Sequence, residues 1–256
     1  MSEVKIIGVI PARLSSTRFN KKVLYKFFGL EMVEHVRRRG LLSNLNKDVY
    51  VASCDNLILK LVENSKGKTI KTGKHHLNGT SRVAEAIQNI DCSHVILLQG
   101  DEPLILPSHI NKIINMIYKN PEINCWNATS KITNYKDLNE QSIVKCAISK
   151  NKYIIDCFRK SPYFSNFATQ RNFIRKVLGI IAFRKDFLLN ISLLEDTQIS
   201  KIESIEQMKI IENDFKLKSF DIFPNLPSVN VELDIEAIYN TYKRSKIQKH
   251  FLKLIL

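Results

Sequence analysis

Along the first half of the chain, continuous apolar runs alternate with segments in which apolar residues recur at helical spacing. Continuous apolar runs, which are typical of buried strands, occupy residues 4–10, 49–53 and 95–98. Apolar residues at helical spacing lie between and after these runs, near residues 32–36, 57–62, 80–90 and 108–118. Strands that alternate with helices usually pair in parallel, because the helix carries the chain back across the sheet. The pattern therefore predicts an α/β fold with a mainly parallel sheet.

The second half of the chain is richer in strand-like segments. Predicted strands cover residues 125–130, 143–149, 153–159, 177–183, 220–223 and 229–233. Residues 204–211 read as a helix, and a terminal helix carries Tyr239 and Tyr242. No repeat or Gly/Ser-rich linker interrupts the sequence. We expect one continuous domain over residues 1–256, with a protruding sub-region at about 125–175.

Charged residues follow the apolar run at 95–98 immediately. The segment is Gln99-Gly100-Asp101-Glu102-Pro103. Ligands of open α/β sheets bind outside the carboxyl ends of the strands, so a carboxylate at this point suits a divalent cation held against a phosphate. A polar turn without a function is equally compatible with this segment taken alone.

The first predicted strand ends at Pro11 and is followed by a basic loop. Arg13, Arg18, Lys21 and Lys22 supply four cations, and small hydroxyl residues lie between them. Guanidinium forks and ammonium groups are suited to a triphosphate. The loop has neither the Walker pattern nor the dinucleotide fingerprint, because the required glycines are missing. By itself it resembles a solvated basic loop, but two oppositely charged strand ends in one domain favour a crevice for a nucleotide and a metal.

Composition narrows the function classes. The chain has 256 residues, 44% of them hydrophobic, and a formal net charge of +14. Its lysines are spread along the sequence without a nucleic-acid-binding motif, so we expect anionic small substrates and no nucleic acid. The five cysteines have no metal-ligand or redox spacing, which is typical of reduced thiols. No run approaches the roughly 20 apolar residues of a membrane span, and we expect a cytoplasmic protein without membrane insertion.

Six short segments, spread nearly from end to end of the chain, form an ordered set. They are Ile10-Pro11-Ala12-Arg13, Ser16-Thr17-Arg18 with Lys22, His76-Leu77-Asn78-Gly79-Thr80-Ser81-Arg82, Gln99-Gly100-Asp101-Glu102-Pro103, Leu178-Gly179-Ile180 and Glu203-Ser204-Ile205-Glu206-Gln207-Met208. Each segment is a weak signal alone, but in this order and spacing they resemble the 3-deoxy-manno-octulosonate cytidylyltransferase (CMP-KDO synthetase) family of acid-sugar cytidylyltransferases.

The resemblance implies an α/β nucleotide-diphospho-sugar-transferase (Rossmann-like) fold of three layers with a mixed, mainly parallel central sheet. It also implies a homodimer that forms through the small protruding sub-region at about 125–175. It also implies an enzyme that transfers CMP from CTP to an acidic sugar, either KDO or a related 2-keto-3-deoxy sugar acid, and releases pyrophosphate. Such a product serves the synthesis of lipopolysaccharide and other cell-surface polysaccharides. The implied cofactor is Mg²⁺.

The resemblance also implies roles for individual residues. Catalysis is assigned to Asp101, Lys22 and Arg18. Nucleotide binding is assigned to Ala12, Arg13, Ser16, Arg18, Lys22, Asn78, Gly79, Thr80 and Arg82. The sugar side is assigned to Gln99, Glu203, Glu206 and Gln207, and Arg159, at the end of a predicted strand, is added because its guanidinium suits a carboxylate. Asp101 is the first metal ligand and Asp234 the second, with Glu232 as the alternative.

Departures from the family pattern leave the acceptor open. Asn78 replaces a Ser, Ser81 replaces an acidic residue, Val177 replaces a His, and the usual Asp-Thr-Pro-Glu-Asp segment near the end is degraded. Another nucleotide or acceptor, a paralogue that binds nucleotide without turnover, and a basic nucleic-acid-binding protein remain alternatives.

Two adjacent histidines precede the segment that is assigned to the nucleotide. His75 and His76 are expected to point in different directions, as neighbours in a chain usually do, so no shared metal is expected there.

Overall fold

The computed structural model describes residues 3–15, 19–45 and 47–256. The chain divides into two compact units. The first unit comprises Met1–Lys119 and Leu226–Leu256, and the second comprises Asn120–Asn225. Both combine helices with a sheet, which confirms the predicted α/β class with a mixed sheet. Whether the chain acts as one domain with a sub-region at about 125–175 stays a prediction.

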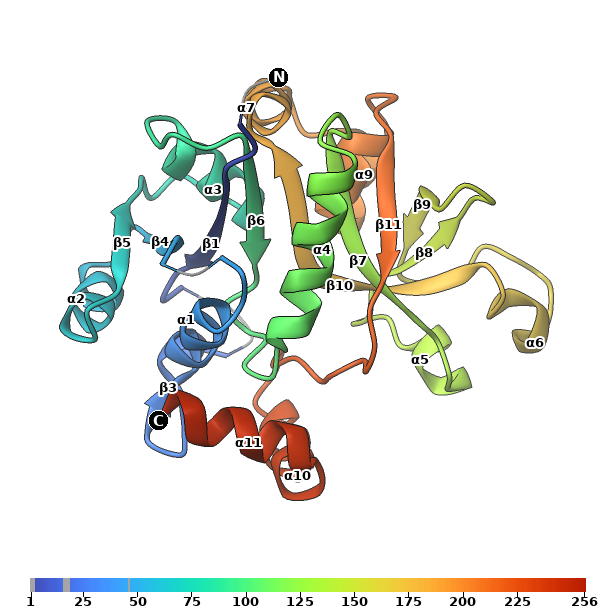
Figure 1. Ribbon diagram of the computed structural model, residues 1–256. Helices are drawn as coiled ribbons and strands as arrows, with labels where there is room; N and C mark the ends of the chain where they lie inside the picture. The colour runs from blue at the N-terminus through green and yellow to red at the C-terminus, as the bar shows by residue number, and fades with distance from the viewer. Residues whose placement is uncertain (1–2, 16–18, 46) are drawn as a thin grey trace. The chain divides into compact units, whose positions relative to one another are not determined.

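The sheet of the first unit is parallel throughout its described pairings. Its strands are β1 (Ile6–Ala12), β4 (Val49–Ser53), β5 (Lys68–Lys71) and β6 (His94–Leu98), in the order β5-β4-β1-β6. All of β6 and most of β1 are buried, as the continuous apolar runs predict. Strand β1 passes through Pro11, which pairs with Ala52, so it ends one residue later than the predicted boundary at Pro11. The ends of β1 and β6 meet at one edge of this sheet (Figure 1).

Helices connect these strands at the predicted places. They are α1 (Met32–Leu41), α2 (Asn56–Asn64), α3 (Gly79–Ile87) and α4 (Pro107–Lys119). A short 3₁₀ turn, η1 (Lys22–Leu24), and a two-stranded ribbon of β2 (Lys26–Phe27) and β3 (Leu30–Glu31) join β1 to α1.

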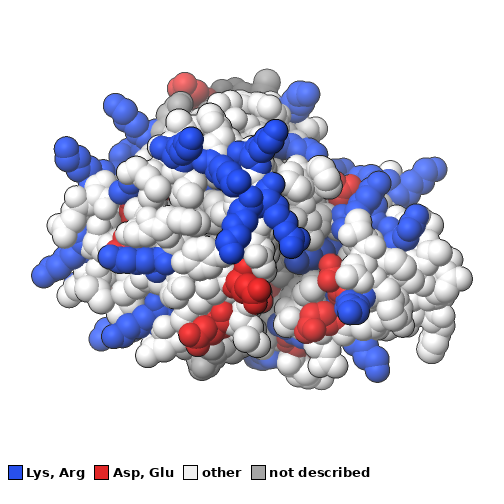
Figure 2. All heavy atoms as spheres, turned by 90° about the horizontal axis from the view of Figure 1, so that it is seen from below, with Lys and Arg blue, Asp and Glu red and all other residues white. Residues whose placement is uncertain are grey.

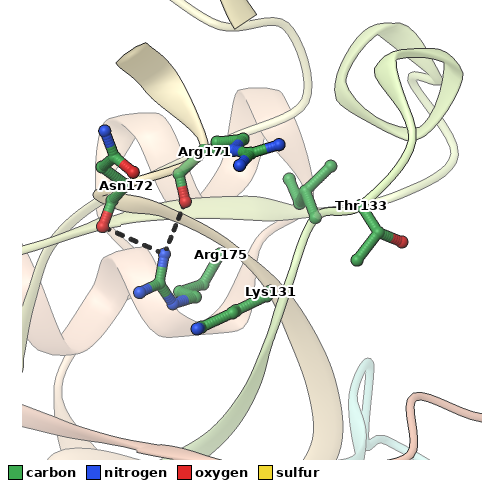
Figure 3. A pocket seen from close by; sticks show the side chains of 6 residues that line it. Lys131, Thr133, Arg171, Asn172 and Arg175 are labelled. Atoms are coloured by element: carbon green, nitrogen blue, oxygen red, sulfur yellow. Dashed lines mark hydrogen bonds between the residues drawn. The ribbon is translucent and has the colours of Figure 1, made fainter. Parts of the chain in front are cut away.

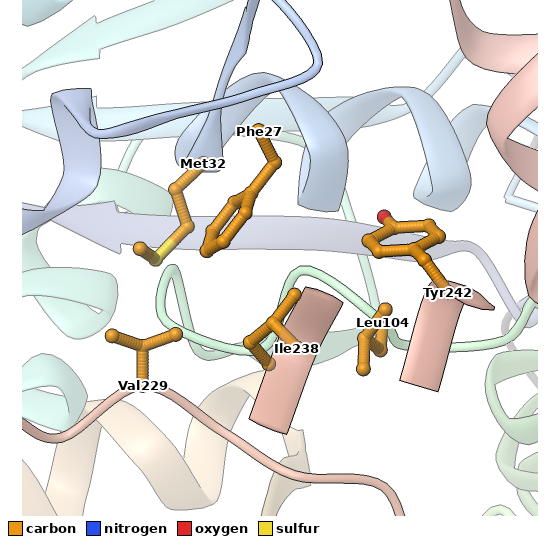
Figure 4. Packing of buried hydrophobic residues seen from close by; sticks show 6 residues of the cluster. All are labelled: Phe27, Met32, Leu104, Val229, Ile238 and Tyr242. Carbon is orange, nitrogen blue, oxygen red and sulfur yellow. The ribbon is translucent and has the colours of Figure 1, made fainter. Parts of the chain in front are cut away.

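The carboxyl-terminal segment packs against the rest of the first unit, to which it belongs. Helices α10 (Asp234–Arg244) and α11 (Lys246–Ile255) close the chain. A cluster of fully or almost fully buried side chains, shown in Figure 4, holds α10 in place; its members are Phe27, Met32, Leu104, Val229, Ile238 and Tyr242. The cluster therefore fixes the loop before α10 by burying Val229, which belongs to that loop.

Antiparallel pairing dominates the second unit. Its strands are β7 (Cys125–Lys131), β8 (Lys145–Ile148), β9 (Tyr153–Phe158), β10 (Ile174–Arg184) and β11 (Leu217–Asp221), in the order β10-β7-β11-β9-β8. Among its described pairings, β7 with β11 is parallel and the others are antiparallel. The register of β10 shifts between Val177 and Ile181, and its first residues also pair with β8. Its helices are α5 (Tyr135–Asn139), α6 (Phe167–Gln170), α7 (Lys185–Leu193), α8 (Gln198–Glu203) and α9 (Glu206–Ile211).

The prediction of a strand at 229–233 is wrong. The alternation of Val229, Val231 and Leu233 imitates a strand, but Val229 has no regular structure, Val231 lies in a bend and Leu233 lies in a turn. Two of their backbone amides bond elsewhere: the amide of Val229 donates to the carbonyl of Asp101, and that of Val231 to the carboxylate of Asp234. The apolar pattern also did not reveal β5 or the helices α5, α6, α7 and α8, and it indicated one terminal helix where α10 and α11 are separate.

The cysteines differ in accessibility. Cys92, Cys125, Cys146 and Cys157 are buried, whereas Cys54 is partly exposed. Burial raises the pKa of the Cys146 thiol to about 12 and also raises the pKa of Cys125 and Cys157. Those three thiols are therefore poor nucleophiles, because the thiolate is the reactive form.

The surface carries the excess of positive charge that the composition gives. Figure 2 shows Lys and Arg side chains scattered over the visible face, with Asp and Glu side chains among them. Within the described residues, no helix combines the length and the apolar character needed to cross a membrane.

Candidate functional site

The basic loop after β1 is fastened at both ends. The amide of Leu14 donates to the carboxylate of Asp55 at 2.8 Å, and the amide of Lys21 donates to the carbonyl of Leu14 at 3.1 Å. Asp55 comes from the end of the neighbouring strand β4, whose Ser53 hydroxyl accepts a hydrogen bond from the Asp55 amide. Lys21 adopts a left-handed conformation with φ of 51° where the loop turns into η1. These contacts return the chain to the sheet edge just before Lys22.

Lys22 joins the basic loop to the acidic strand end. Its Nζ donates to Asp101 Oδ2 at 2.7 Å and to the carbonyl of Val229 at 2.8 Å. The side chains of Lys22 and Asp101 are 12% and 26% exposed, so solvent reaches the pair. We call Lys22, Asp101 and Val229 the strand-end site. It places a cation and a carboxylate at the edge of the sheet where the sequence predicts a nucleotide and a metal.

The first turn of α3 reaches the same edge. Asn78 caps the helix, because its Oδ1 accepts a hydrogen bond from the amide of Ser81 at 2.9 Å. A Cβ on Gly79 would lie 3.1 Å from the ring of Pro11 and 3.6 Å from the amide nitrogen of Gln99. A side chain at Gly79 would press on the end of β1, so glycine allows the helix to approach both strand ends. The amino end of α3 is positively polarised, which favours an anionic ligand in front of it.

Arg82 faces the interior. It is 3% exposed, and its guanidinium donates to the hydroxyl of Thr72 and the carbonyl of Gly73. Its bonds hold the loop before α3, and a direct role in nucleotide binding stays a prediction.

The remaining residues assigned to nucleotide binding differ in how far they are exposed. Ala12 is the last residue of β1 and is buried, and Arg13 follows it with an exposed side chain. Thr80 lies in the first turn of α3 and is half-buried. Ser16 and Arg18 lie outside the described residues.

Asp234 closes the loop that precedes α10. Its Oδ2 accepts hydrogen bonds from the amides of Asn230 at 2.7 Å and Val231 at 3.0 Å. Glu232 is exposed in the same loop. A role for either carboxylate as the second metal ligand stays a prediction. The observed hydrogen bonds show that Asp234 stabilises the loop before α10.

The residues assigned to the sugar side, other than Gln99, belong to the second unit. Arg159 follows β9, and its guanidinium donates to the carbonyls of Gln141, Glu203 and Ser204. Glu203 ends α8 and Glu206 begins α9. The predicted contact of Arg159 with a sugar carboxylate stays a prediction.

The partly buried Gln207 belongs to a chain of amide hydrogen bonds that was not predicted from the sequence. Its Nε2 donates to Asn127 Oδ1 at 2.9 Å, and Asn127 Nδ2 donates to the carbonyl of Leu178 at 2.9 Å. Asn127 is 0% exposed. A polar residue within the buried strand β7 was the available signal, because a buried amide requires partners.

The second unit also contains a cationic pocket of about 320 Å³. It is lined by Lys131, Ile132, Thr133, Arg171, Asn172 and Arg175, and Figure 3 shows five of them labelled. Arg175 is nearly buried; its Nη1 donates to the carbonyls of Arg171 and Asn172, and its Nε lies 3.4 Å from Asp221 Oδ1. Three cationic side chains suit an anionic ligand.

The chain is similar to known proteins over most of its length. The family model described as cytidylyltransferase matches residues 7–219. The chain is 34% identical to the 3-deoxy-manno-octulosonate cytidylyltransferase of Fusobacterium nucleatum over 96% of this chain and 100% of the relative. It is 35% identical to the protein of that name from Thermodesulfovibrio yellowstonii, over 92% of this chain and 98% of the relative.

Solved structures share the fold. A CMP:2-keto-3-deoxy-manno-octonic acid synthetase complexed with CTP has a TM-score of 0.86 and 28% identity, covering 94% of this chain and 99% of that chain. A 4-diphosphocytidyl-2C-methyl-D-erythritol synthase from Anaerococcus prevotii, at 13% identity and a TM-score of 0.61, shows the fold alone. By its sequence and its fold, this chain belongs to the cytidylyltransferases, within the 3-deoxy-manno-octulosonate cytidylyltransferase family.

Proposed function

We propose that this protein transfers CMP from CTP to 3-deoxy-manno-octulosonate (KDO), releases pyrophosphate, and so supplies an activated sugar for lipopolysaccharide synthesis. The observation that carries the proposal is the match, over nearly the whole chain, to relatives that bear this name at 34 and 35% identity. The cation–carboxylate pair at the strand ends supports it, because it lies where the chemistry needs charge.

Binding of the triphosphate is proposed to use the basic loop and the amino end of α3. Arg13 is exposed beside the strand end, and Lys22 is held there by Asp101 and Val229. The amino end of α3 contributes a partial positive charge, and its glycine allows phosphate or ribose to come close to the backbone. These groups gather positive charge around the phosphates before the reaction begins.

The chemical step is a displacement at the α-phosphorus. The anomeric hydroxyl oxygen forms a bond to the α-phosphorus, its proton leaves to solvent, and the bond to the bridging oxygen of the β-phosphate breaks with its electrons on pyrophosphate. Lys22 stands close enough to the strand ends to neutralise charge that develops on the phosphate oxygens. Positioning and charge stabilisation supply most of the rate in such reactions.

Mg²⁺ is proposed as the cofactor, and Asp101 would hold it. A partly exposed carboxylate at a strand end fits, because Mg²⁺ is commonly bound by one or two carboxylates together with substrate phosphates and water. The ion, when bound, would neutralise phosphate charge and favour ionisation of the attacking hydroxyl. Lys22 would exchange its bond to Asp101 for one to a phosphate.

The protein is further proposed to be a cytoplasmic homodimer that pairs through the sub-region at about 125–175. Large hydrophobic side chains stand exposed there: Tyr135 at 60%, Ile155 at 55% and Phe164 fully. Exposed apolar surface of this kind is typical of protein interfaces. Light scattering coupled to size-exclusion chromatography tests the dimer, and a monomer at all concentrations would contradict it.

The experiment that tests the reaction measures pyrophosphate. Purified protein with CTP, KDO and Mg²⁺ should release pyrophosphate, and omission of the sugar or addition of a chelator should stop the release. Other nucleoside triphosphates and other 2-keto-3-deoxy sugar acids should react more slowly. Binding of CTP without pyrophosphate release from any sugar acid would contradict the proposed reaction.

A second candidate acceptor is a related 2-keto-3-deoxy sugar acid. Val177, at the register shift of β10, stands where the family pattern has a His. A faster rate with another acid than with KDO would select this candidate.

A further inference from the structure

Two histidines and a glutamate converge beside the first turn of α3. Ligand atoms of His75, His76 and Glu85 all lie within 4.8 Å of one another. The two imidazole rings have centroids 4.2 Å apart and planes tilted by 41°. This corrects the expectation that the histidines point apart: they lie in an irregular segment, with bends at Lys74 and Leu77, rather than in an extended strand. We call these three residues the histidine cluster.

The backbone leaves space for this convergence at Gly73. A Cβ on Gly73 would lie 2.5 Å from the ring of His75, at both Cε1 and Nδ1. The same Cβ would lie 3.5 Å from Glu85 Oε2. Any side chain at position 73 would therefore displace the ring of His75, so glycine allows His75 to stand beside Glu85.

Neighbouring groups orient the other two members. His76 Nε2 is hydrogen-bonded to Glu85 Oε2, and its Nδ1 lies 3.2 Å from the hydroxyl of Ser81. Both carboxylate oxygens of Glu85 accept from the amide of Gly73. Burial raises the pKa of Glu85, but the hydrogen bonds from His76 and Gly73 and the nearby histidines outweigh it and lower the pKa.

The Ser81 hydroxyl can fix the imidazole of His76 in the form that binds metals. Its oxygen lies 3.2 Å from the carbonyl of Asn78, to which it can donate. It then accepts from Nδ1–H of His76, so that Nε2, beside Glu85, is the ring nitrogen that can bind a metal once its proton is released. A second group that holds the remaining ring nitrogen is a regular feature of metal-ligating histidines.

We propose that His75, His76 and Glu85 form a binding site for a divalent transition metal of the Zn²⁺ class. Two imidazole nitrogens and one carboxylate oxygen are a ligand set that such ions accept, and three protein ligands leave a position for water. The ion takes the place of the proton between His76 and Glu85, and the proton leaves to solvent. The site is separate in its donors from the strand-end site, where oxygen ligands suit Mg²⁺.

The proposed ion would brace the loop that leads into α3. The three ligands tie residues 75 and 76 to the second turn of the helix through Glu85. His76 also contacts Ser81, whose amide is capped by Asn78. A metal in the cluster would thus hold the residues on both sides of the helix start, and this consequence does not depend on the substrate of the enzyme.

The test is a Zn²⁺ titration of the chelator-treated full-length protein against a chromophoric chelator. One ion per chain is expected, together with a melting temperature that rises with Zn²⁺ concentration. His75→Asn should weaken Zn²⁺ binding at least about tenfold, as should Ser81→Ala through loss of the bond that orients His76. His75 is exposed, so His75→Asn should fold normally, which its melting temperature without metal verifies.

Two variants serve as matched controls. His250→Asn removes an exposed histidine on α11, and Cys54→Ser removes the partly exposed thiol; both should bind Zn²⁺ as the unaltered protein does. Absence of Zn²⁺ binding, equal affinity in His75→Asn, or loss of binding in either control would overturn the proposal. None of these readouts involves pyrophosphate release, so this proposal and the proposed function fail independently.

Discussion

The strand-end site and the histidine cluster are built on opposite principles. The strand-end site joins residues 22, 101 and 229, which meet only when the sheet and the carboxyl-terminal segment are both in place. The histidine cluster lies within residues 75–85, where one loop and one helix suffice. The first site therefore depends on the tertiary fold, whereas the second depends mainly on local geometry.

The two sites also differ in the ions that they suit. The strand-end site offers a carboxylate and a backbone carbonyl beside a lysine, which matches a hard cation brought in with phosphates. The histidine cluster offers imidazole nitrogen, which matches a borderline-soft ion. One carboxylate stands in each site, and its neighbours decide which chemistry it serves.

The largest expected effect concerns Asp101. Asp101→Asn should lower turnover by on the order of 10²–10³, because it removes the proposed metal ligand and the partner of Lys22. Pyrophosphate release under saturating substrates measures the loss. Zn²⁺ binding should be unchanged, since the two sites share no residue.

Asp48→Asn is the matched control for this change. Asp48 pairs with Lys68 on the surface, where both side chains are more than two-fifths exposed. Turnover in this variant should match that of the unaltered protein. Equal turnover in Asp101→Asn and the unaltered protein would refute the metal assignment.

The dependence on the tertiary fold can be tested from a distance. Ile238→Ala removes a fully buried side chain from the cluster that also holds Val229. The expected loss is about 2–5 kcal/mol in the free energy of unfolding, measured by urea denaturation. Turnover should fall as well, because the loop at Val229 loosens, while Zn²⁺ binding should persist. Loss of Zn²⁺ binding in this variant without loss of turnover would contradict the difference proposed between the two sites.

Much of the first unit could be predicted from the sequence. The buried strands β1, β4 and β6 appear as continuous apolar runs, and the rule about strand ends brings Lys22 and Asp101 together without further information. The loop at 229–233 could not be predicted, because its amides bond to Asp101 and Asp234 and no local pattern reveals such partners. The histidine cluster was missed for a similar reason: the direction of His75 depends on the missing side chain at Gly73.

A histidine outside the histidine cluster, His35, is fully buried. His35 lies in the core, where its Nε2 donates to the carbonyl of Phe27 and its Nδ1 accepts from the hydroxyl of Tyr242. Burial lowers the pKa of His35 from 6.5 to about 4. Between these values the unfolded chain takes up a proton that the folded protein does not.

The free energy of unfolding should therefore fall as the pH decreases from 6.5 toward 4, by up to about 3 kcal/mol from this residue. Above pH 6.5 the contribution is constant, because His35 is neutral in both states. Urea denaturation across this range measures the slope. His35→Gln should flatten it relative to His250→Asn, and equal slopes in both variants would contradict the assignment to His35.

The smallest expected effect concerns Asn78, which caps the amino end of α3. Asn78→Ala removes the cap of the helix and should cost about 1 kcal/mol in the free energy of unfolding. Asn78→Ser retains a capping oxygen and should lose less. Differential scanning calorimetry compares the two variants, and an equal loss in both would show that the capping bond is not responsible.

The different exposure of the cysteines makes the protein a candidate for direct spectroscopic observation. Four thiols are buried, and Cys54 stands next to Asp55, which fastens the start of the basic loop. A maleimide dye should attach at that position first, without any engineered residue. Its emission would then report whether the surroundings of Asp55 change when a nucleotide binds.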